Sequence, residues 1–184
     1  MRLFVSVDLP DDHADAVRDL QNEFRGASGL NVTDPEQAHV TLKFLGDTPE
    51  RRVDRVSDAI ARGVEAADVD PFAVEYGGLG VFPDFDYISV LWLGVRDGGE
   101  QLTRLHEEIE AETTAIGFDP EDHEFTPHVT LARMEHAGGK ELVQETVRTL
   151  DPTVGKATVE AVHLTESELT HDGPVYSTVE RFPL

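Results

Sequence analysis

The sequence predicts an α+β fold with two pseudo-symmetric lobes, each a small, mostly antiparallel sheet backed by helices, and a central cleft between them. Three observations support this prediction. Strand-like and helix-like patterns alternate along all 184 residues, without a linker or a low-complexity segment. The tetrapeptide His-Val-Thr-Leu occurs at residues 39–42 and again at 128–131. Both copies lie in similar strand and helix surroundings, so we expect one copy in each lobe.

The first half of the chain is expected to contain two strands and two helices. The first strand alternates in side-chain type and ends at a proline. Two aspartates then precede apolar residues at helical spacing, as at a capped helix start. The first His-Val-Thr-Leu copy forms the next strand, and the Thr-Pro pair after it is typical of a helix start. These elements are expected at residues 3–9, 11–24, 39–45 and 48–66, with a loop rich in glycine, asparagine and proline at 26–37.

The second half is expected to contain five strands and two helices. Two runs of β-branched and aromatic residues, joined by a proline- and aspartate-rich turn, predict a pair of strands. A helix that ends at a glycine separates them from the second His-Val-Thr-Leu copy, and a further helix precedes a final strand pair. These elements are expected at residues 71–81, 87–95, 100–116, 126–134, 140–150, 157–164 and 175–182. We therefore expect one two-lobed domain that spans residues 1–184.

The repeated tetrapeptide is the main candidate for a functional site. Side chains alternate along a strand, so His39 and Thr41 point to one side, and His128 and Thr130 do the same in the second copy. An imidazole beside a hydroxyl can offer a proton-transfer group and a hydrogen-bond donor to one small anion. Chance would repeat all four letters only once in about two hundred such chains. A shared site is therefore favoured over the alternative of two ordinary core strands.

Charge and composition restrict the function classes. The chain has 37 acidic and 15 basic residues and a net charge of −22, which argues against a general nucleic-acid binder. An acidic shell of this kind is typical of halophilic proteins, and we expect a halophilic archaeon as the source; an acidic mesophilic protein is the alternative. In molar salt the Debye length falls to about 3 Å, so a small basic pocket could still hold a phosphate.

Location and assembly follow from simpler features. The absence of cysteine excludes disulfides and thiolate metal sites, which suits a cytoplasmic protein. The N-terminal apolar run is too short for a signal peptide, and no stretch is long enough to span a membrane. The length allows a substantial apolar core without a partner, so we expect a monomer.

Segments along nearly the whole chain, in one order, resemble a known family. They are Arg-Leu-Phe-Val at 2–5, Asp-Leu-Pro at 8–10, and the segments 39–46, 78–83, 91–95, 117–118, 125–133, 166–167 and 173–176. This set is similar to the two-histidine phosphoesterases with paired His-x-Thr-x motifs, and within them to the RNA 2′,3′-cyclic phosphodiesterases, also called 2′-5′ RNA ligases. The combination is far more specific than the tetrapeptide alone.

The resemblance implies metal-free hydrolysis of a terminal ribose 2′,3′-cyclic phosphate to a 2′-phosphate, without a cofactor. The partners would be RNA ends or nucleotides that carry the cyclic phosphate, and no membrane. His39 would be the general acid that protonates the departing 3′ oxygen, and His128 the general base that activates water. Thr41 and Thr130 would bind the non-bridging phosphate oxygens, and Arg133 matches the family arginine that contacts the phosphate.

The assignments of three side chains stay open. Arg133 is an odd number of positions from His128, so a regular strand would direct it away from the site unless the strand ends or bulges after Ala132, or the side chain curls around the edge. Lys43 shares parity with His39 and could add positive charge there, or it could face water at the strand end. Phe82 could stack on a base at the cleft rim or pack in the core.

The remaining histidine motifs are expected to be structural. His163 begins a third His-x-Thr triplet in the last strand pair, and His106 lacks the second histidine of a zinc-protease helix. Two other functions stay open beside cyclic-phosphate hydrolysis, namely 2′-5′ ligation of RNA halves and binding of RNA ends without turnover. The natural substrate could be tRNA halves, mRNA fragments or a small cyclic nucleotide.

Overall fold

Nine strands and four α-helices alternate along the computed structural model, which describes residues 1–184. Three 3₁₀ turns, η1 (Asp11–His13), η2 (Pro35–Gln37) and η3 (Glu50–Arg52), precede α1, β3 and α2. In chain order the main elements are β1 (Arg2–Asp8), α1 (Ala14–Asn22), β2 (Leu30–Val32), β3 (His39–Asp47), α2 (Val53–Ala67), β4 (Phe72–Pro83), β5 (Ile88–Asp97), α3 (Gly99–Ala115), β6 (His128–Met134), α4 (Lys140–Thr149), β7 (Thr153–Val159), β8 (Ala161–Thr170) and β9 (Gly173–Pro183).

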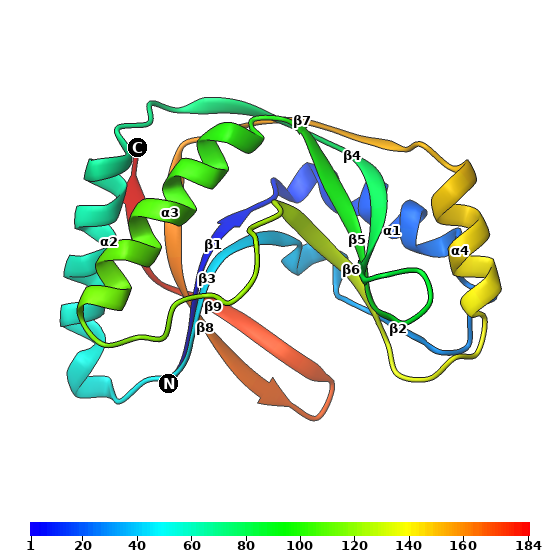
Figure 1. The fold of residues 1–184 in the computed structure, drawn as a ribbon, viewed down its shortest axis with the longest axis horizontal. Coiled ribbons are helices and arrows are strands. Elements are labelled where there is room, and N and C mark those ends of the chain that lie inside the picture. The colour runs from blue at the N-terminus through cyan, green and yellow to red at the C-terminus, as the bar shows by residue number, and fades with distance from the viewer.

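The strands form one antiparallel sheet in the order β7-β4-β5-β6-β3-β1-β8-β9, with β2 paired to β6. Each half of this order has four strands, and the two halves meet where β3 lies beside β6. There a single residue pair, Val40 with Val129, joins them. The predicted α+β class and the antiparallel pairing are confirmed, and the two lobes share a continuous, curled sheet (Figure 1).

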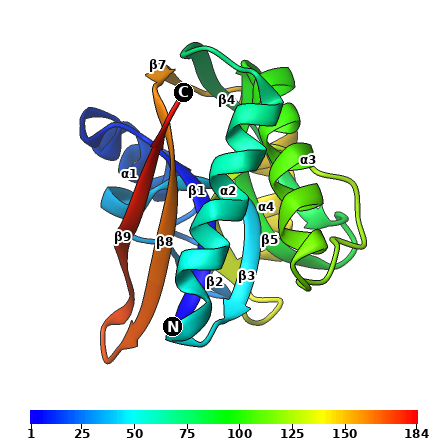
Figure 2. The same ribbon diagram turned by 90° about the vertical axis from the view of Figure 1, so that its left-hand side faces the viewer.

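The helices cover the two halves in pairs. In Figure 1, α2 and α3 lie beside the half that contains β1, β3, β8 and β9, whereas α1 and α4 lie beside the other half. The chain crosses over between them, because α1 follows β1 yet packs on β6, and α3 follows β5 yet packs on β3. Seen from the side, the β8-β9 hairpin lies on the opposite side of α2 from α3 (Figure 2).

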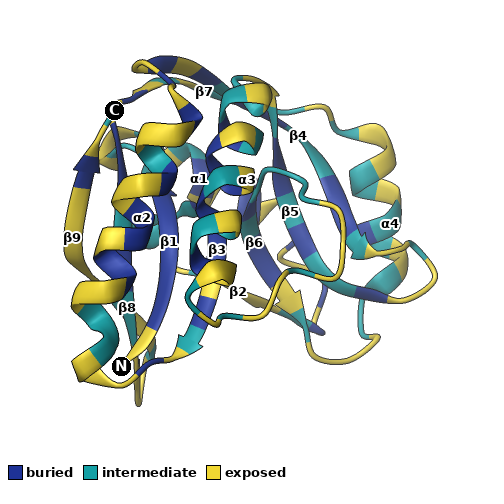
Figure 3. Cartoon of the chain, turned by 60° about the vertical axis from the view of Figure 1, so that its left-hand side comes forward, coloured by how far each residue is buried: buried dark blue, intermediate teal, exposed yellow.

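An apolar core holds helices and sheet together. The inward faces of α2 and α3 are buried while their outward faces are exposed, as the alternating colours along these helices show (Figure 3). Gly63 allows the two helices to approach closely, because a β-carbon there would lie 2.8 Å from the Cα of Ile109. Both valines of the central pair, Val40 and Val129, belong to the same core cluster as these helices.

Two predictions from local sequence were wrong. Residues 26–37 were expected to form a loop, but they contain β2, which pairs with the end of β6. The strand expected at 157–164 is in fact two strands: β7 ends at Val159 beside β4, and β8 begins at Ala161 beside β1. Val159 and Ala161 are both buried and Glu160 between them is exposed, so the alternation of a single strand continues across the break and does not show it. No helix in the structure is both long and apolar enough to cross a membrane.

Candidate active site

The two His-x-Thr segments meet on one face of the sheet, at the junction of its halves. Because Val40 pairs with Val129 in an antiparallel register, His39 lies across from Thr130 and Thr41 across from His128. The two histidines therefore occupy one diagonal of a four-residue rectangle, and the two threonines occupy the other. Diagonal neighbours on adjacent strands are separated by about 7–8 Å. This spacing allows two imidazoles to contact opposite sides of one phosphate group. We call this side of the sheet the site face.

A β-bulge follows the histidine and threonine in each motif strand. In β3, Leu42 is the extra residue, since Thr41 pairs with Ser6 and Lys43 pairs with Val5. In β6, Leu131 is the extra residue, since Thr130 pairs with Trp92 and Ala132 pairs with Leu91. Each bulge places two consecutive buried residues on the core face, Leu42 with Lys43 and Leu131 with Ala132. The alternation is thereby shifted by one residue in both strands.

The bulge in β6 explains how Arg133 reaches the site. An odd spacing from His128 would direct its side chain to the core in a regular strand. Because Leu131 is inserted, Arg133 emerges on the site face and is exposed. Burial lowers the pKa of His39 and His128 and raises that of Tyr176, and the guanidinium of Arg133 lies close enough to all three to act toward a lower pKa. The sequence allowed a bulge after Ala132, whereas in the structure the bulge lies before Ala132, at Leu131.

The corresponding bulge in β3 has the opposite consequence for Lys43, and the expectation that Lys43 adds positive charge to the site is corrected. The lysine is turned into the core face and is only 2% exposed. There its Nζ donates to the carbonyl of Asp119 at 2.7 Å and pairs with Glu110 at 3.5 Å and Glu121 at 3.7 Å. Phe44, the next residue, takes the position that corresponds to Arg133 and is 62% exposed.

Side chains from two helices bind the backbone carbonyls of the two bulge residues. The carbonyl of Leu42 faces His106 Nδ1 of α3 at 2.7 Å, and the carbonyl of Leu131 accepts from Gln21 Nε2 of α1 at 3.0 Å. Each of these helices supports the motif strand of the half of the sheet that it covers, although the strand before it in the chain belongs to the other half. His106 therefore has a structural role.

Both motif histidines are oriented by the same device. The Nδ1 of His39 lies 2.9 Å from the carbonyl of Gln37, and the Nδ1 of His128 lies 2.6 Å from the carbonyl of Thr126. A carbonyl only accepts, so Nδ1 carries the proton in each ring and Nε2 is left for proton transfer. In the neutral state the Nε2 of His39 accepts from the Thr41 hydroxyl at 3.1 Å.

The surroundings of the two histidines differ in charge. Burial is the main cause that lowers the pKa of both below the usual value. Asp8, the cross-strand neighbour of His39 on β1, acts in the opposite direction and raises the pKa of His39. The charged groups that affect His128 are His39, Arg133 and His123, and each lowers its pKa. Asp8 is thus the one neighbouring charge that favours a protonated imidazole, and it acts on His39, whereas Arg133 favours the neutral form of both rings.

Aromatic rings enclose both imidazoles. Phe82 lies edge-on to His128 with ring centroids 4.9 Å apart, and Trp92 lies behind it. Phe82, whose place the sequence left open between the cleft rim and the core, thus lies against the imidazole of His128. At the other histidine, Phe4 and Tyr176 lie 5.0 and 5.2 Å from the His39 ring. Neither had a role assigned from the sequence, although both belong to segments that carried the family resemblance. Tyr176 reaches His39 from β9, which β1 and β8 separate from β3 in the sheet order.

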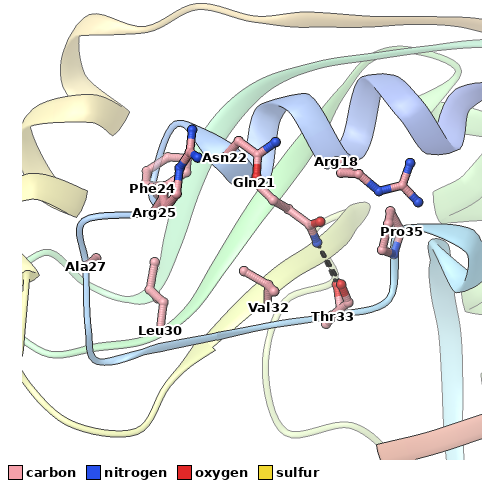
Figure 4. Close-up of a pocket in the computed structure, with 10 residues that line it drawn as sticks. All are labelled: Arg18, Gln21, Asn22, Phe24, Arg25, Ala27, Leu30, Val32, Thr33 and Pro35. Carbon is pink, nitrogen blue, oxygen red and sulfur yellow. Dashed lines mark hydrogen bonds between the residues drawn. The ribbon is translucent and has the colours of Figure 1, made fainter.

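The structure has one pocket beside His39 and a larger cavity away from both histidines. A pocket of about 150 Å³ lies beside His39 and is lined by Phe4, Asp8, Glu36, Tyr176 and hydroxyl residues of β8 and β9. A larger cavity of about 380 Å³ lies between α1 and residues 27–35, as Figure 4 shows. This second cavity contains none of the four motif residues. Its Gln21 and Thr33 instead hold the edge of β6 through bonds to the Leu131 carbonyl at 3.0 and 3.1 Å.

Fold and site together are those of the two-histidine phosphoesterases: a curled antiparallel sheet that brings two His-x-Thr strands side by side. A family model described as the 2′-5′ RNA ligase superfamily matches residues 9–170, and the chain belongs to this superfamily.

Named relatives cover the whole chain. A protein of Methanothermobacter thermautotrophicus called RNA 2′,3′-cyclic phosphodiesterase is 35% identical over all of this chain and 99% of its own length. A protein of Archaeoglobus fulgidus with the same name is 32% identical over 99% of both chains. The crystal structure of a Thermus thermophilus protein superposes with a TM-score of 0.80 at 31% identity, over 100% of this chain and 98% of that one. Escherichia coli LigT in complex with 3′-AMP shares the fold, with a TM-score of 0.79 at 21% identity over 100% and 97% of the two chains.

Proposed function

We propose that this protein is an RNA 2′,3′-cyclic phosphodiesterase, which hydrolyses the terminal cyclic phosphate of an RNA or a nucleotide to a 2′-phosphate. The observation that carries the proposal is the diagonal pair of imidazoles across the Val40–Val129 junction, each with Nδ1 bound to a carbonyl and Arg133 on the same face. The names of the relatives support the same reaction.

In the proposed mechanism, His39 is the general acid and His128 is the general base. Water attacks phosphorus on the His128 side and loses a proton to its Nε2, while the P–O3′ bond breaks and the 3′ oxygen takes a proton from His39 Nε2. The charges around the rings support this assignment, because Asp8 favours the protonated form of His39 and every charged neighbour of His128 favours its neutral form.

The remaining site residues are proposed to stabilise the transition state. Negative charge builds on the equatorial phosphate oxygens, where Thr41 and Thr130 can donate hydroxyl protons and Arg133 can supply a guanidinium. Phe82 is proposed to keep the His128 ring in place and shield it from water. The two imidazoles supply both proton transfers and Arg133 supplies the positive charge, so we propose a metal-free reaction.

The proposal is tested by incubating the protein with a nucleoside 2′,3′-cyclic phosphate in molar potassium chloride that contains EDTA. We expect conversion to the nucleoside 2′-phosphate, with a bell-shaped dependence of kcat/KM on pH, because one histidine must be neutral and the other protonated. A 3′-phosphate product would contradict the assignment of the 3′ oxygen as the leaving group. Activity that is lost in EDTA and returns with a divalent ion would contradict the metal-free mechanism.

Asp8→Asn is expected to lower the upper pH limit of activity. The carboxylate raises the pKa of His39, so its removal lowers that pKa and the acid loses its proton at lower pH. The basic limb of the kcat/KM profile should move to lower pH, and the loss of activity should grow as pH rises. Asp12→Asn, at an exposed position outside the site, is the matched control. An unchanged basic limb in Asp8→Asn would contradict the assignment of His39 as the acid.

A second candidate reaction is 2′-5′ joining of RNA ends, for which the superfamily is named. A 5′-hydroxyl would replace water on the His128 side, and the same two groups would transfer the protons. Product analysis separates the reactions, since hydrolysis leaves a 2′-phosphate end and joining gives a longer strand. Binding of RNA ends without turnover would be favoured instead if the wild-type protein retained such ends for hours in high salt without releasing a 2′-phosphate.

We also propose that the protein works as a monomeric, single two-lobed domain in the cytoplasm of a halophilic archaeon. The net charge of −22 with only three lysines supports the saline setting. The contiguous core that includes both motif strands supports a single domain. Unfolding measured between 0.1 and 3 M potassium chloride would test the saline setting. The molecular mass in the same range would test the monomeric state.

A further inference from the structure

We propose that Gln37 is a positioning residue for the general acid, acting through Tyr176. This inference rests on the proposed function, because it assigns the means by which His39 is held and desolvated. Three bonds of this one residue carry it. Its backbone carbonyl accepts from His39 Nδ1 at 2.9 Å, its Nε2 donates to the carbonyl of Pro174 at 3.0 Å, and its Oε1 accepts from the backbone N–H of Tyr176 at 2.9 Å.

The side chain of Gln37 pairs with an open sheet edge. β9 is the last strand in the sheet order, so β8 occupies one of its edges and no strand occupies the other. The amide of Gln37 bonds a carbonyl and an N–H two residues apart, as the peptide group of a neighbouring strand would. Only a side chain with both a donor and an acceptor can make this pair of bonds. Gln37 therefore fixes the beginning of β9 to η2, the turn that leads into β3.

This attachment determines where the Tyr176 ring lies. Tyr176 stands edge-on to His39 with centroids 5.2 Å apart and edge-on to Phe4 at 5.1 Å. The ring thus closes one side of the imidazole, on the strand that Gln37 holds. Burial of this kind is the largest cause of the lowered pKa of His39. The bond from His39 Nδ1 to the Gln37 backbone carbonyl raises the pKa of His39, and Gln37→Ala keeps that carbonyl. Loss of the Gln37 side chain should therefore reach His39 through the packing of the Tyr176 ring.

The arrangement has no counterpart at the second histidine. His128 also binds the carbonyl of the residue two positions before it, but that residue is Thr126, whose side chain makes no bond to a sheet edge. The two halves of the site share the His-x-Thr pattern and the bulge, and differ in this attachment. Substitution of Gln37 should accordingly change the position and pKa of His39, the proposed acid, and leave those of His128 unchanged.

The first test is Gln37→Ala in the full chain, assayed with a nucleoside 2′,3′-cyclic phosphate in molar potassium chloride. Displacement of the acid by a fraction of an ångström to 1 Å is expected to lower kcat/KM about tenfold to a hundredfold. Loss of the Tyr176 packing exposes His39 to water, so its pKa should rise toward the ordinary value and the basic limb of the profile should move to higher pH. This shift is opposite to the one expected for Asp8→Asn.

The matched control is Gln144→Ala. Gln144 also joins two segments by a side-chain bond, from its Nε2 to the carbonyl of Phe85 at 2.7 Å, but it lies on α4 away from His39. We expect Gln144→Ala to lower Tm comparably and leave kcat/KM and the pH profile unchanged. If Gln37→Ala behaved in the same way, with no shift of the basic limb, the residue would be a structural tether only and the proposal would be overturned.

A double-mutant cycle separates action through Tyr176 from other effects. If Gln37 works by holding the Tyr176 ring, Gln37→Ala should cost little further activity in a Tyr176→Ala background. If the fold-loss of kcat/KM in the double variant equalled the product of the two single fold-losses, the proposal would be contradicted. Should Tyr176→Ala not fold, Tyr176→Leu serves as the second background.

An NMR titration of the His39 ring without substrate, in wild type and Gln37→Ala, tests the positioning of His39 even if the wild-type protein proves inactive. A higher pKa in the variant supports the inference, and an equal pKa contradicts it. Failure of the hydrolysis assay in wild type would, by contrast, count against the proposed function alone.

Discussion

His39→Ala and His128→Ala are each expected to lower kcat/KM for a nucleoside 2′,3′-cyclic phosphate by at least about a hundredfold. A positioned proton transfer contributes about 10²- to 10⁴-fold in rate, and each variant removes one of the two. The measurement is single-turnover and steady-state hydrolysis in molar potassium chloride. The double variant should be much less impaired than the product of the two single losses, because the imidazoles act on one transition state.

Exposed histidines supply the control for this experiment. His171 lies in the turn between β8 and β9 and is exposed, so His171→Ala should retain wild-type activity. Near-normal turnover by either His39→Ala or His128→Ala would remove the two-histidine mechanism. Equal unfolding midpoints among all three variants would show that the losses are catalytic.

Lys43→Ala is expected to reduce stability strongly. The variant leaves Glu110 and Glu121 without their shared cation and the Asp119 carbonyl without its donor. Removal of one partner of a buried ion pair costs about 3–5 kcal/mol. The two carboxylates are 20% and 22% exposed, which favours the lower end of this range. A loss of about 3 kcal/mol corresponds to a fall in Tm of roughly 6–12 °C for a chain of this size.

Lys156→Ala is the matched control for Lys43→Ala. Its Nζ lies 3.6 Å from Glu75, but the lysine side chain is 74% exposed, and exposed pairs contribute about 0–1 kcal/mol. We expect a small change in Tm for this variant. If Lys43→Ala kept its stability and lost phosphate binding instead, Lys43 would belong to the site after all.

Local patterns were sufficient for most of the helices and strands. The amphipathic spacing in α1, α2, α3 and α4 placed all four helices, because their apolar residues face the sheet at helical intervals. The strands around both His-Val-Thr-Leu copies were also predicted, since short β-branched runs between turn residues are specific to strands. The Thr-Pro pair at residues 48–49 predicted the start of α2, but the Thr48 hydroxyl donates to the carbonyl of Gly46 and the helix begins through η3 without a side-chain cap.

Local sequence patterns did not predict the break between β7 and β8. Val159 and Ala161 are both buried, yet they belong to opposite halves of the sheet. Buried and exposed side chains alternate without interruption from Val159 through Glu160 to Ala161, whereas the partners of each strand are far away in sequence. The same holds for β2, whose three residues are a strand only because the edge of β6 is free to pair with them.

The sequence by itself determined the two His-x-Thr strands, the side on which each histidine and threonine points, and the family to which the chain is similar. These follow from the two-residue period of a strand and from local repetition. The tertiary structure decided which charged side chain joins the histidines. A one-residue bulge after each threonine sends Arg133 to the site face and Lys43 to the core, and the pairing across β1, β5 and the crossing helices is what makes each bulge. Side-chain direction beyond a bulge depends on partners distant in sequence, which no local pattern contains.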